Sequence, residues 1–136
     1  MKHKVLIVTS NYYQDISKNL VKDAAKVLEK SKIKYKIINV TGVFEIPVII
    51  AKNIKKYDGF IALGCVIRGE TAHFDFISKA SIDGIMLLSI NYKKPIGNGI
   101  LTCNNHSQAS ARSDLKGNKR KGKEAAQAVT SVLKIK

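Results

Sequence analysis

Four short apolar runs recur along the chain, and each has the length of a buried strand. They cover residues 4–9, 33–40, 60–65 and 96–102. The run at 33–40 alternates in part and is rich in isoleucine, whereas the others are nearly continuous, as in central strands of a parallel sheet. The last run is interpreted as a strand despite its two glycines.

Stretches with helical spacing separate and follow these runs. In the first stretch Ile16, Leu20 and Leu28 fall on one face of an amphipathic helix, and Asp15 or Ser17 is the candidate N-cap. The other helices are expected near residues 47–56, 73–91, 108–112 and 125–133. The third of these five helices should bury a stripe that includes Phe74 and Ile85.

This alternation of strands and helices predicts an α/β fold. Residues 1–136 should form one domain, a three-layer α/β/α sandwich with a four-stranded parallel sheet, right-handed crossovers and a flavodoxin-like style. Ligands of such folds bind outside the carboxyl ends of the strands. The loops that follow the strands are therefore the places to look for a site.

The net charge of +14 suggests an anionic partner such as nucleic acid. Nearly all of this charge is lysine, with only three arginines, and no basic-aromatic interleaving is present. Because nucleic-acid readers favour arginine forks and stacking aromatics, a solvated lysine-rich surface is the better interpretation. Nucleic acid remains a disfavoured alternative.

Hydropathy and cysteine content indicate in which cellular compartment the protein is expected. The chain is 45% hydrophobic with no membrane-length apolar run and no leader pattern, so a soluble, cytoplasmic protein is expected. Cys65 and Cys103 lie in apolar strands far from any Cys-x-x-Cys spacing, and they should be reduced core thiols. We expect no metal site, because one would need more ligands and His3, His73 and His106 are scattered along the chain.

The loop at residues 64–75, GCVIRGETAHFD, is the strongest candidate site. It leads from a strand end into a helix start, where free N–H groups and the helix dipole attract anions. Thr71 could hold a phosphate or could act only as an N-cap. His73, on the first helical turn, is the candidate for proton transfer, since the dipole there disfavours the imidazolium. The loop matches neither a P-loop nor a dinucleotide fingerprint.

Two other loops add aromatic and cationic groups. Tyr12, Tyr13 and Phe44 follow strand ends and could sandwich a flat heterocycle, or they could only cap the core. Arg112 and the basic cluster 116–123 offer mobile positive charge for a phosphate. The alternative is that this cluster is only solvated surface. His3 and His106 have no such context and are interpreted as incidental.

Three strings make the pattern familiar: GVFEIP at 42–47, LGCVIRGETAHFDF at 63–76 and NGILT at 98–102. Together, at these spacings, they resemble the lumazine synthase family over about residues 5–132. The resemblance implies a transferase of riboflavin biosynthesis that condenses 5-amino-6-(D-ribitylamino)uracil with 3,4-dihydroxy-2-butanone 4-phosphate. The product would be 6,7-dimethyl-8-ribityllumazine, with release of phosphate and water and without a cofactor.

The resemblance also implies roles for individual residues. His73 takes the catalytic proton-transfer position. The ribitylaminouracil would be bound by Tyr12, Val43, Phe44, Glu45, Cys65, Val66, Ile67 and Asn98. The butanone phosphate would be bound by Glu70, Thr71, Arg112 and Lys121. Of these, Asn98 and Arg112 match residues that the family supplies from a neighbouring subunit.

The resemblance further implies a homopentamer or a multiple of it with active sites at subunit interfaces, and riboflavin synthase as a further partner. One departure is Asn104, which stands where the family often has a glutamate and puts local hydrogen bonding in doubt. Two other functions stay open: a flavin- or lumazine-binding module of the same fold without turnover, and riboflavin synthase of the type built on this fold. The 64–75 loop fits the lumazine enzyme better.

Overall fold

The computed structural model describes residues 2–135 of the chain. The elements in order are β1 (Lys4–Ser10), α1 (Gln14–Lys30), β2 (Lys34–Val40), a 3-10 turn (Val43–Glu45), α2 (Ile46–Asn53), β3 (Gly59–Ile67), α3 (His73–Tyr92), β4 (Ile96–Cys103), α4 (His106–Ser113) and α5 (Lys121–Leu133). All four predicted strands are confirmed, with ends that move by at most two residues.

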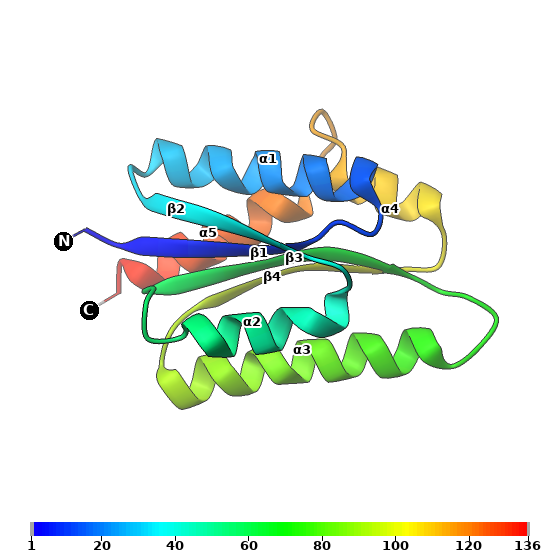
Figure 1. The fold of residues 1–136 in the computed structure, drawn as a ribbon. Coiled ribbons are helices and arrows are strands. Elements are labelled where there is room, and N and C mark those ends of the chain that lie inside the picture. The colour runs from blue at the N-terminus through cyan, green and yellow to red at the C-terminus, as the bar shows by residue number, and fades with distance from the viewer. Residues whose placement is uncertain (1, 136) are drawn as a thin grey trace.

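The four strands form one parallel sheet in the order β2-β1-β3-β4. Helices cover both faces: α1, α4 and α5 lie on one side, and α2 and α3 lie on the other (Figure 1). Alternate β1 residues supply two cores, because Val5 and Ile7 pack toward α1 and α5 while Leu6 and Val8 pack toward α2 and α3. The three-layer prediction is confirmed.

Three helix starts differ from the sequence prediction: those of α1, of α4 and of α5, which begins at Lys121 rather than near residue 125. The N-cap of α1 is Tyr13, which makes no side-chain cap bond, so the assignment of the cap to Asp15 or Ser17 is wrong. Asp15 lies within the first turn, and the Ser17 hydroxyl donates to the Gln14 carbonyl. The chain turns sharply from β1 into α1, which starts the helix before the residues that have capping side chains.

The start of α4 is also earlier than expected. Its N-cap is Asn105, whose side-chain oxygen accepts the backbone N–H of Gln108 at 2.9 Å. This is the usual device by which asparagine satisfies a free amide at a helix start. The helix therefore begins at His106 rather than near residue 108.

Close packing at one glycine shapes the carboxyl end of the sheet. A Cβ on Gly64, in β3, would lie 2.8 Å from the Val43 side chain and 3.1 Å from that of Ser10. Because Gly64 has no side chain, the 3-10 turn can pack directly on β3 beside the end of β1. This contact brings two of the predicted site loops together.

Helix α3 is apolar on two opposite faces. The predicted inner stripe is confirmed, with Phe74, Ser81 and Ile85 buried against the sheet. On the opposite face lies what we call the α3 outer stripe: Phe76, Met86, Leu87 and Ile90, each more than half exposed. No helix within residues 2–135 is both long and apolar enough to span a membrane. The exposure of these four apolar side chains is what makes the stripe a surface suited to contact with protein.

Candidate active site

A cleft of about 560 Å³ opens at the carboxyl ends of β1 and β3, beside the 3-10 turn and the start of α3. We call it the aromatic cleft. Its lining includes eight residues that the sequence singled out: Tyr12, Val43, Phe44, Glu45, Cys65, Val66, Ile67 and His73. The location at strand ends is the one expected for a parallel sheet.

Two aromatic rings stand open in this cleft. Tyr12 is 71% exposed and Phe44 is 58% exposed, so neither ring caps the core. Tyr13, in contrast, is partly buried against the core, and its ring meets that of Tyr12 edge-on at 4.9 Å. The core-capping interpretation therefore holds for Tyr13 alone, and Tyr12 and Phe44 are free to stack on a ligand.

The floor of the aromatic cleft carries no charge at neutral pH. Burial raises the pKa of the Cys65 thiol to about 12, helped by the nearby Cys103 and Asp15. The pKa of the Tyr13 hydroxyl is also raised, mainly by burial and to a smaller extent by the nearby Tyr12 and Cys65. Both cysteines are free and buried, as expected of core thiols. Cys65 therefore offers an apolar surface rather than a nucleophile.

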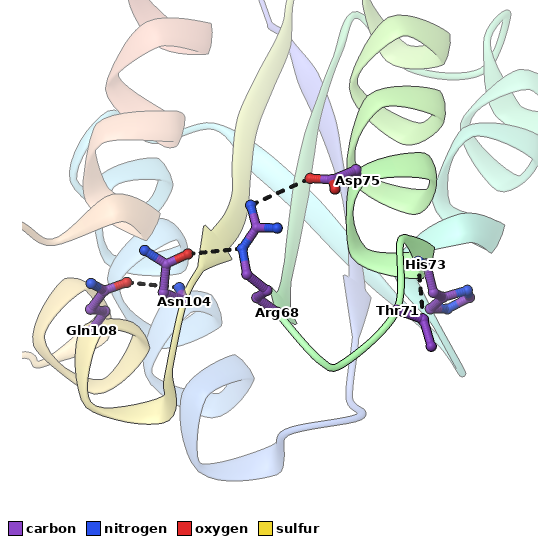
Figure 2. Close-up of polar contacts among 6 residues, drawn as sticks. All are labelled: Arg68, Thr71, His73, Asp75, Asn104 and Gln108. Carbon is purple, nitrogen blue, oxygen red and sulfur yellow. Dashed lines mark hydrogen bonds and ion pairs between the residues drawn. The ribbon is translucent and has the colours of Figure 1, made fainter.

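His73 is the first residue of α3 and lines the aromatic cleft with its exposed side chain. The N-cap of α3 is Ala72, and the backbone N–H of His73 donates to the Thr71 hydroxyl at 3.3 Å (Figure 2). Thr71 thus serves the helix start locally although it is not the cap residue itself. Glu70 and Thr71 are exposed beside His73 but are not part of the cleft wall.

A second cleft, of about 480 Å³, lies along β4 and the start of α5. We call it the cationic cleft, since Arg112, Lys119 and Lys121 line it together with Asn98. The Arg112 guanidinium donates to the Gln108 carbonyl at 3.2 Å, and the Asn98 side chain accepts the Ile100 N–H at 3.0 Å. These bonds use part of each group and leave other donors for a ligand.

The basic cluster 116–123 is not uniformly mobile, contrary to the sequence prediction. Arg120 donates two hydrogen bonds, of 3.1 and 2.8 Å, to the carboxylate of Asp23 in α1. Asp23 is 2% exposed, and the bonds to it raise the pKa of Arg120. Next to this pair, Gly122 approaches the Leu20 backbone so closely that a Cβ would lie 2.3 Å from the Leu20 oxygen. The pair fixes the linker, so that Lys119 and Lys121 face the cleft.

The two clefts share no lining residue. Eight of the predicted site residues lie in the aromatic cleft, whereas Asn98, Arg112 and Lys121 lie in the cationic cleft. One copy of the chain therefore separates the open aromatic rings and His73 from the cations.

Sequence reasoning missed several wall residues. Ser10, Thr41 and Ile77 line the aromatic cleft, and Ile82 and Asn118 line the cationic cleft. Ile77 belongs to the predicted inner stripe of α3, and its position one turn after His73 is the signal that could have found it. Ser10 and Thr41 directly follow the predicted strands 4–9 and 33–40, so their places at strand ends could have found them, whereas Ile82 and Asn118 have no distinctive pattern in the sequence.

His106, interpreted as incidental to the site, makes a contact on the surface of the fold. Its ring nitrogen Nε2 lies 3.0 Å from the Asp15 carboxylate, and its ring meets that of Tyr13 edge-on at 6.3 Å. The contact joins the start of α4 to the start of α1, below the aromatic cleft.

Within residues 2–135, no group of three or more histidine, cysteine, aspartate or glutamate side chains is placed to hold a metal ion.

Known proteins with similar sequences cover nearly the whole chain. The sequence model of the 6,7-dimethyl-8-ribityllumazine synthase family matches residues 2–136. The 6,7-dimethyl-8-ribityllumazine synthase of Bartonella bacilliformis is 45% identical over 136 residues, which are 97% of this chain and 89% of that protein. The one of Agrobacterium fabrum is 42% identical over 142 residues, which are 99% of this chain and 95% of that protein.

Proposed function

The chain belongs to the 6,7-dimethyl-8-ribityllumazine synthase family, and on that basis we propose that its two clefts bind the two substrates of this reaction. The enzyme condenses 5-amino-6-(D-ribitylamino)uracil with 3,4-dihydroxy-2-butanone 4-phosphate in riboflavin biosynthesis. An aromatic amine attacks a ketone, phosphate leaves and a ring closes. The division of labour between the clefts follows from their chemistry.

The aromatic cleft binds the ribitylaminouracil. Tyr12 stacks on the pyrimidine, and the open ring of Phe44 forms the facing wall. Its polar and apolar contacts come from Val43, Glu45, Cys65, Val66 and Ile67. A flat, polar heterocycle needs an apolar slot with a few hydrogen-bonding groups at its rim, which is the composition of this cleft.

His73 carries out proton transfers during the condensation. Its imidazole is exposed in the cleft wall, so it can reach a substrate bound there. Losing a positioned acid–base group typically slows a reaction by about 10² to 10⁴. The remaining acceleration comes from holding the amine and the ketone in reacting geometry.

The cationic cleft binds the phosphate of the second substrate. Arg112 and Lys121 supply positive charge, and Asn98 supplies an amide to the pyrimidine of a substrate held by the neighbouring copy. Glu70 and Thr71, exposed next to His73, complete the phosphate end from the side of the aromatic cleft. The phosphate thus lies between the start of α3 in one copy and the start of α5 in the next.

The observation that carries this proposal is the separation of the two clefts on one chain. A reaction between two substrates requires both clefts at one place, and only a neighbouring copy can bring the second. The α3 outer stripe, apolar and exposed, is a suitable contact for a second copy of this chain. A homopentamer, or a multiple of it, closes such head-to-tail contacts into a ring.

Two further assignments belong to this proposal. The free, buried thiols of Cys65 and Cys103 are consistent with a reducing compartment and support a cytoplasmic location. Riboflavin synthase is the proposed partner, because the lumazine made here is the compound from which riboflavin is formed. Co-purification of riboflavin synthase with this protein, left unmodified in the α3 outer stripe, tests the proposed partnership.

Subunit complementation tests the shared site. His73→Ala impairs the aromatic cleft and Arg112→Ala impairs the cationic cleft. Each variant alone should form almost no lumazine when lumazine absorbance is followed at a low concentration of the phosphate substrate. Coexpressed in equal amounts with different tags and purified through both tags, the two variants should recover about a quarter of the wild-type rate per site, because random assembly pairs two intact clefts at that frequency.

The controls decide between the alternatives. Mixing the two variants after each has assembled should recover nothing, since no exchange has taken place. If the coexpressed oligomer also stays silent although wild type is active, both clefts act within one chain and the interfacial site is wrong. Wild type that binds lumazine without forming it would instead identify a binding module.

A further inference from the structure

One side chain, Arg68, joins the end of β3 to the ends of two other elements (Figure 2). Its Nε donates to the Asn104 side-chain oxygen at 3.1 Å, after the end of β4, and its Nη2 donates to Asp75 in α3 at 3.4 Å. The guanidinium also lies over the Phe74 ring, 4.5 Å from its centroid. The backbone N–H of Arg68 donates to the Cys103 carbonyl at 2.9 Å. We call these contacts the Arg68 clamp.

The loop that the clamp spans has few other contacts. Residues 69–72 are all exposed, and a Cβ on Gly69 would meet no atom within 4 Å. Among residues 2–135, the hydrogen bonds of this loop join Thr71 to His73 and Ala72 to Phe76, so they are internal to the loop and helix. The first turn of α3 is therefore held to the sheet by buried Phe74 and by the Arg68 clamp.

Asn104 is itself held in place. Its backbone N–H donates to the Gln108 side chain at 2.8 Å, and Gln108 in turn is bound by the N-cap Asn105. The side-chain oxygen of Asn104 therefore accepts a hydrogen bond from Arg68 without contributing a negative charge. An anchored neutral acceptor fixes the direction of the guanidinium and leaves Asp75 as its ion-pair partner.

We propose that Arg68 is a positioning residue for the reaction, which holds the first turn of α3 so that His73 projects into the aromatic cleft. The inference rests on the proposed role of His73. Figure 2 shows Arg68 and His73 extending to different sides of the loop, and Arg68 is not part of either cleft. Arg68 thus acts through the backbone of residues 68–75 rather than by touching a substrate.

A double-mutant cycle tests this action through His73. Arg68→Met keeps the apolar stem over Phe74 but removes the fork, and it should lower kcat about tenfold, since small misplacements of reacting groups are costly. KM for the ribitylaminouracil should stay within about threefold of wild type, because Arg68 lines neither cleft. In the His73→Ala background the same change should alter kcat less than about twofold.

Conservative variants sharpen the test. Arg68→Lys should recover part of the lost kcat, since it restores the charge but not the fork. Asn104→Leu should resemble Arg68→Met, whereas Asn104→Asp, which keeps the acceptor, should stay close to wild type. Lys26→Met is the matched control, because Lys26 is an exposed cation on α1 for which no hydrogen bond or ion pair is found within residues 2–135. It should change none of these quantities.

Amide hydrogen exchange separates this inference from the proposed function. Arg68→Met should speed exchange of the hydrogen-bonded amides of Arg68, His73 and Phe76 about tenfold while the other strand amides keep their protection, and this holds whether or not lumazine is formed. Unchanged exchange would falsify the clamp. So would effects that multiply in the double mutant, since they would show that Arg68 acts independently of His73. If His73→Ala alone leaves kcat unchanged, the assignment of His73 fails and exchange still decides on the clamp.

Discussion

The aromatic cleft and the cationic cleft are built in different ways. The aromatic cleft lies at the ends of buried strands, and residues of its wall come shortly after core residues such as Leu63 and Val8 in the chain. The cationic cleft lies on the edge strand β4 and on a linker held by a remote ion pair, Arg120 with Asp23. The first is rigid because the core is rigid, whereas the second depends on a few polar contacts.

This difference assigns a different kind of recognition to each cleft. Apolar walls select a flat ring by its shape and by the area they bury, and added salt affects this little. Lysine and arginine select an anion by charge, and salt screens this attraction. The comparison predicts that changes in one cleft affect one substrate and spare the other.

Breaking the support of the cationic cleft should have the largest effect. Arg120→Met leaves the Asp23 carboxylate buried without its partner, and we expect Tm to fall by on the order of 10 °C, since an unpaired buried charge is costly. KM for the phosphate substrate should rise as well, because Lys119 and Lys121 flank Arg120 at the start of α5, which is no longer held to α1. Thermal unfolding by circular dichroism measures the first effect.

The double variant Asp23→Leu with Arg120→Met separates the two effects. Removing both charges should restore most of the lost Tm, because apolar replacements of a buried pair are often neutral. The KM for the phosphate substrate should stay high. If Arg120→Met alone leaves Tm unchanged, the pair does not anchor the linker.

Removing the arginine of the cationic cleft comes next. Arg112→Ala should raise KM for the butanone phosphate about 10- to 100-fold, the worth of a charge-assisted hydrogen bond. KM for the ribitylaminouracil should be nearly unchanged. Lys116→Ala, outside both clefts, is the control. If both variants raised KM for the butanone phosphate equally, the effect would come from general surface charge rather than from the cationic cleft.

Removing one ring of the aromatic cleft should give the converse result with a smaller effect. Tyr12→Ala should raise KM for the ribitylaminouracil about tenfold, since an aromatic stack on a base is worth about 1–3 kcal/mol. Tyr12→Phe keeps the ring and should behave like wild type. A matching rise in KM for the phosphate substrate would contradict the separation of the clefts.

The smallest effect concerns the thiol at the floor of the aromatic cleft. The pKa of Cys65 is about 12 in the fold against an ordinary value of 9.0, so the folded state holds this proton longer than the unfolded chain. The stability that Cys65 contributes is therefore complete below pH 9 and is lost as pH rises toward 12. At pH 9.5, alkylation by iodoacetamide should be much slower in the native protein than in urea, and equal rates would show that the thiol is not buried.

Much of the fold and of the aromatic cleft could be predicted from the sequence. Apolar runs such as residues 60–65 identify strands directly, and parallel strands must end at one edge of the sheet, so Tyr12, Phe44 and His73 had to lie close together. Local spacing carries this information. The resemblance to a family added which of these residues meet which substrate.

Contacts between distant parts of the chain could not be predicted in this way. Arg120 and Asp23 are 97 residues apart, and nothing in the pattern of either segment indicates the other. The same holds for His106 and Asp15. Helix α3 shows a related limit, because the buried stripe with Phe74 and Ile85 could be predicted, whereas its pattern does not say what meets the second apolar face.

The exposed face of α3 also has a thermal consequence. Contacts between apolar side chains such as Phe76 and Leu87 weaken on cooling, because their hydration becomes less unfavourable. Copies of the chain joined through this face would separate in the cold and at high dilution, while each copy kept its own fold. Storage on ice would then silence the enzyme reversibly, and warming would restore it.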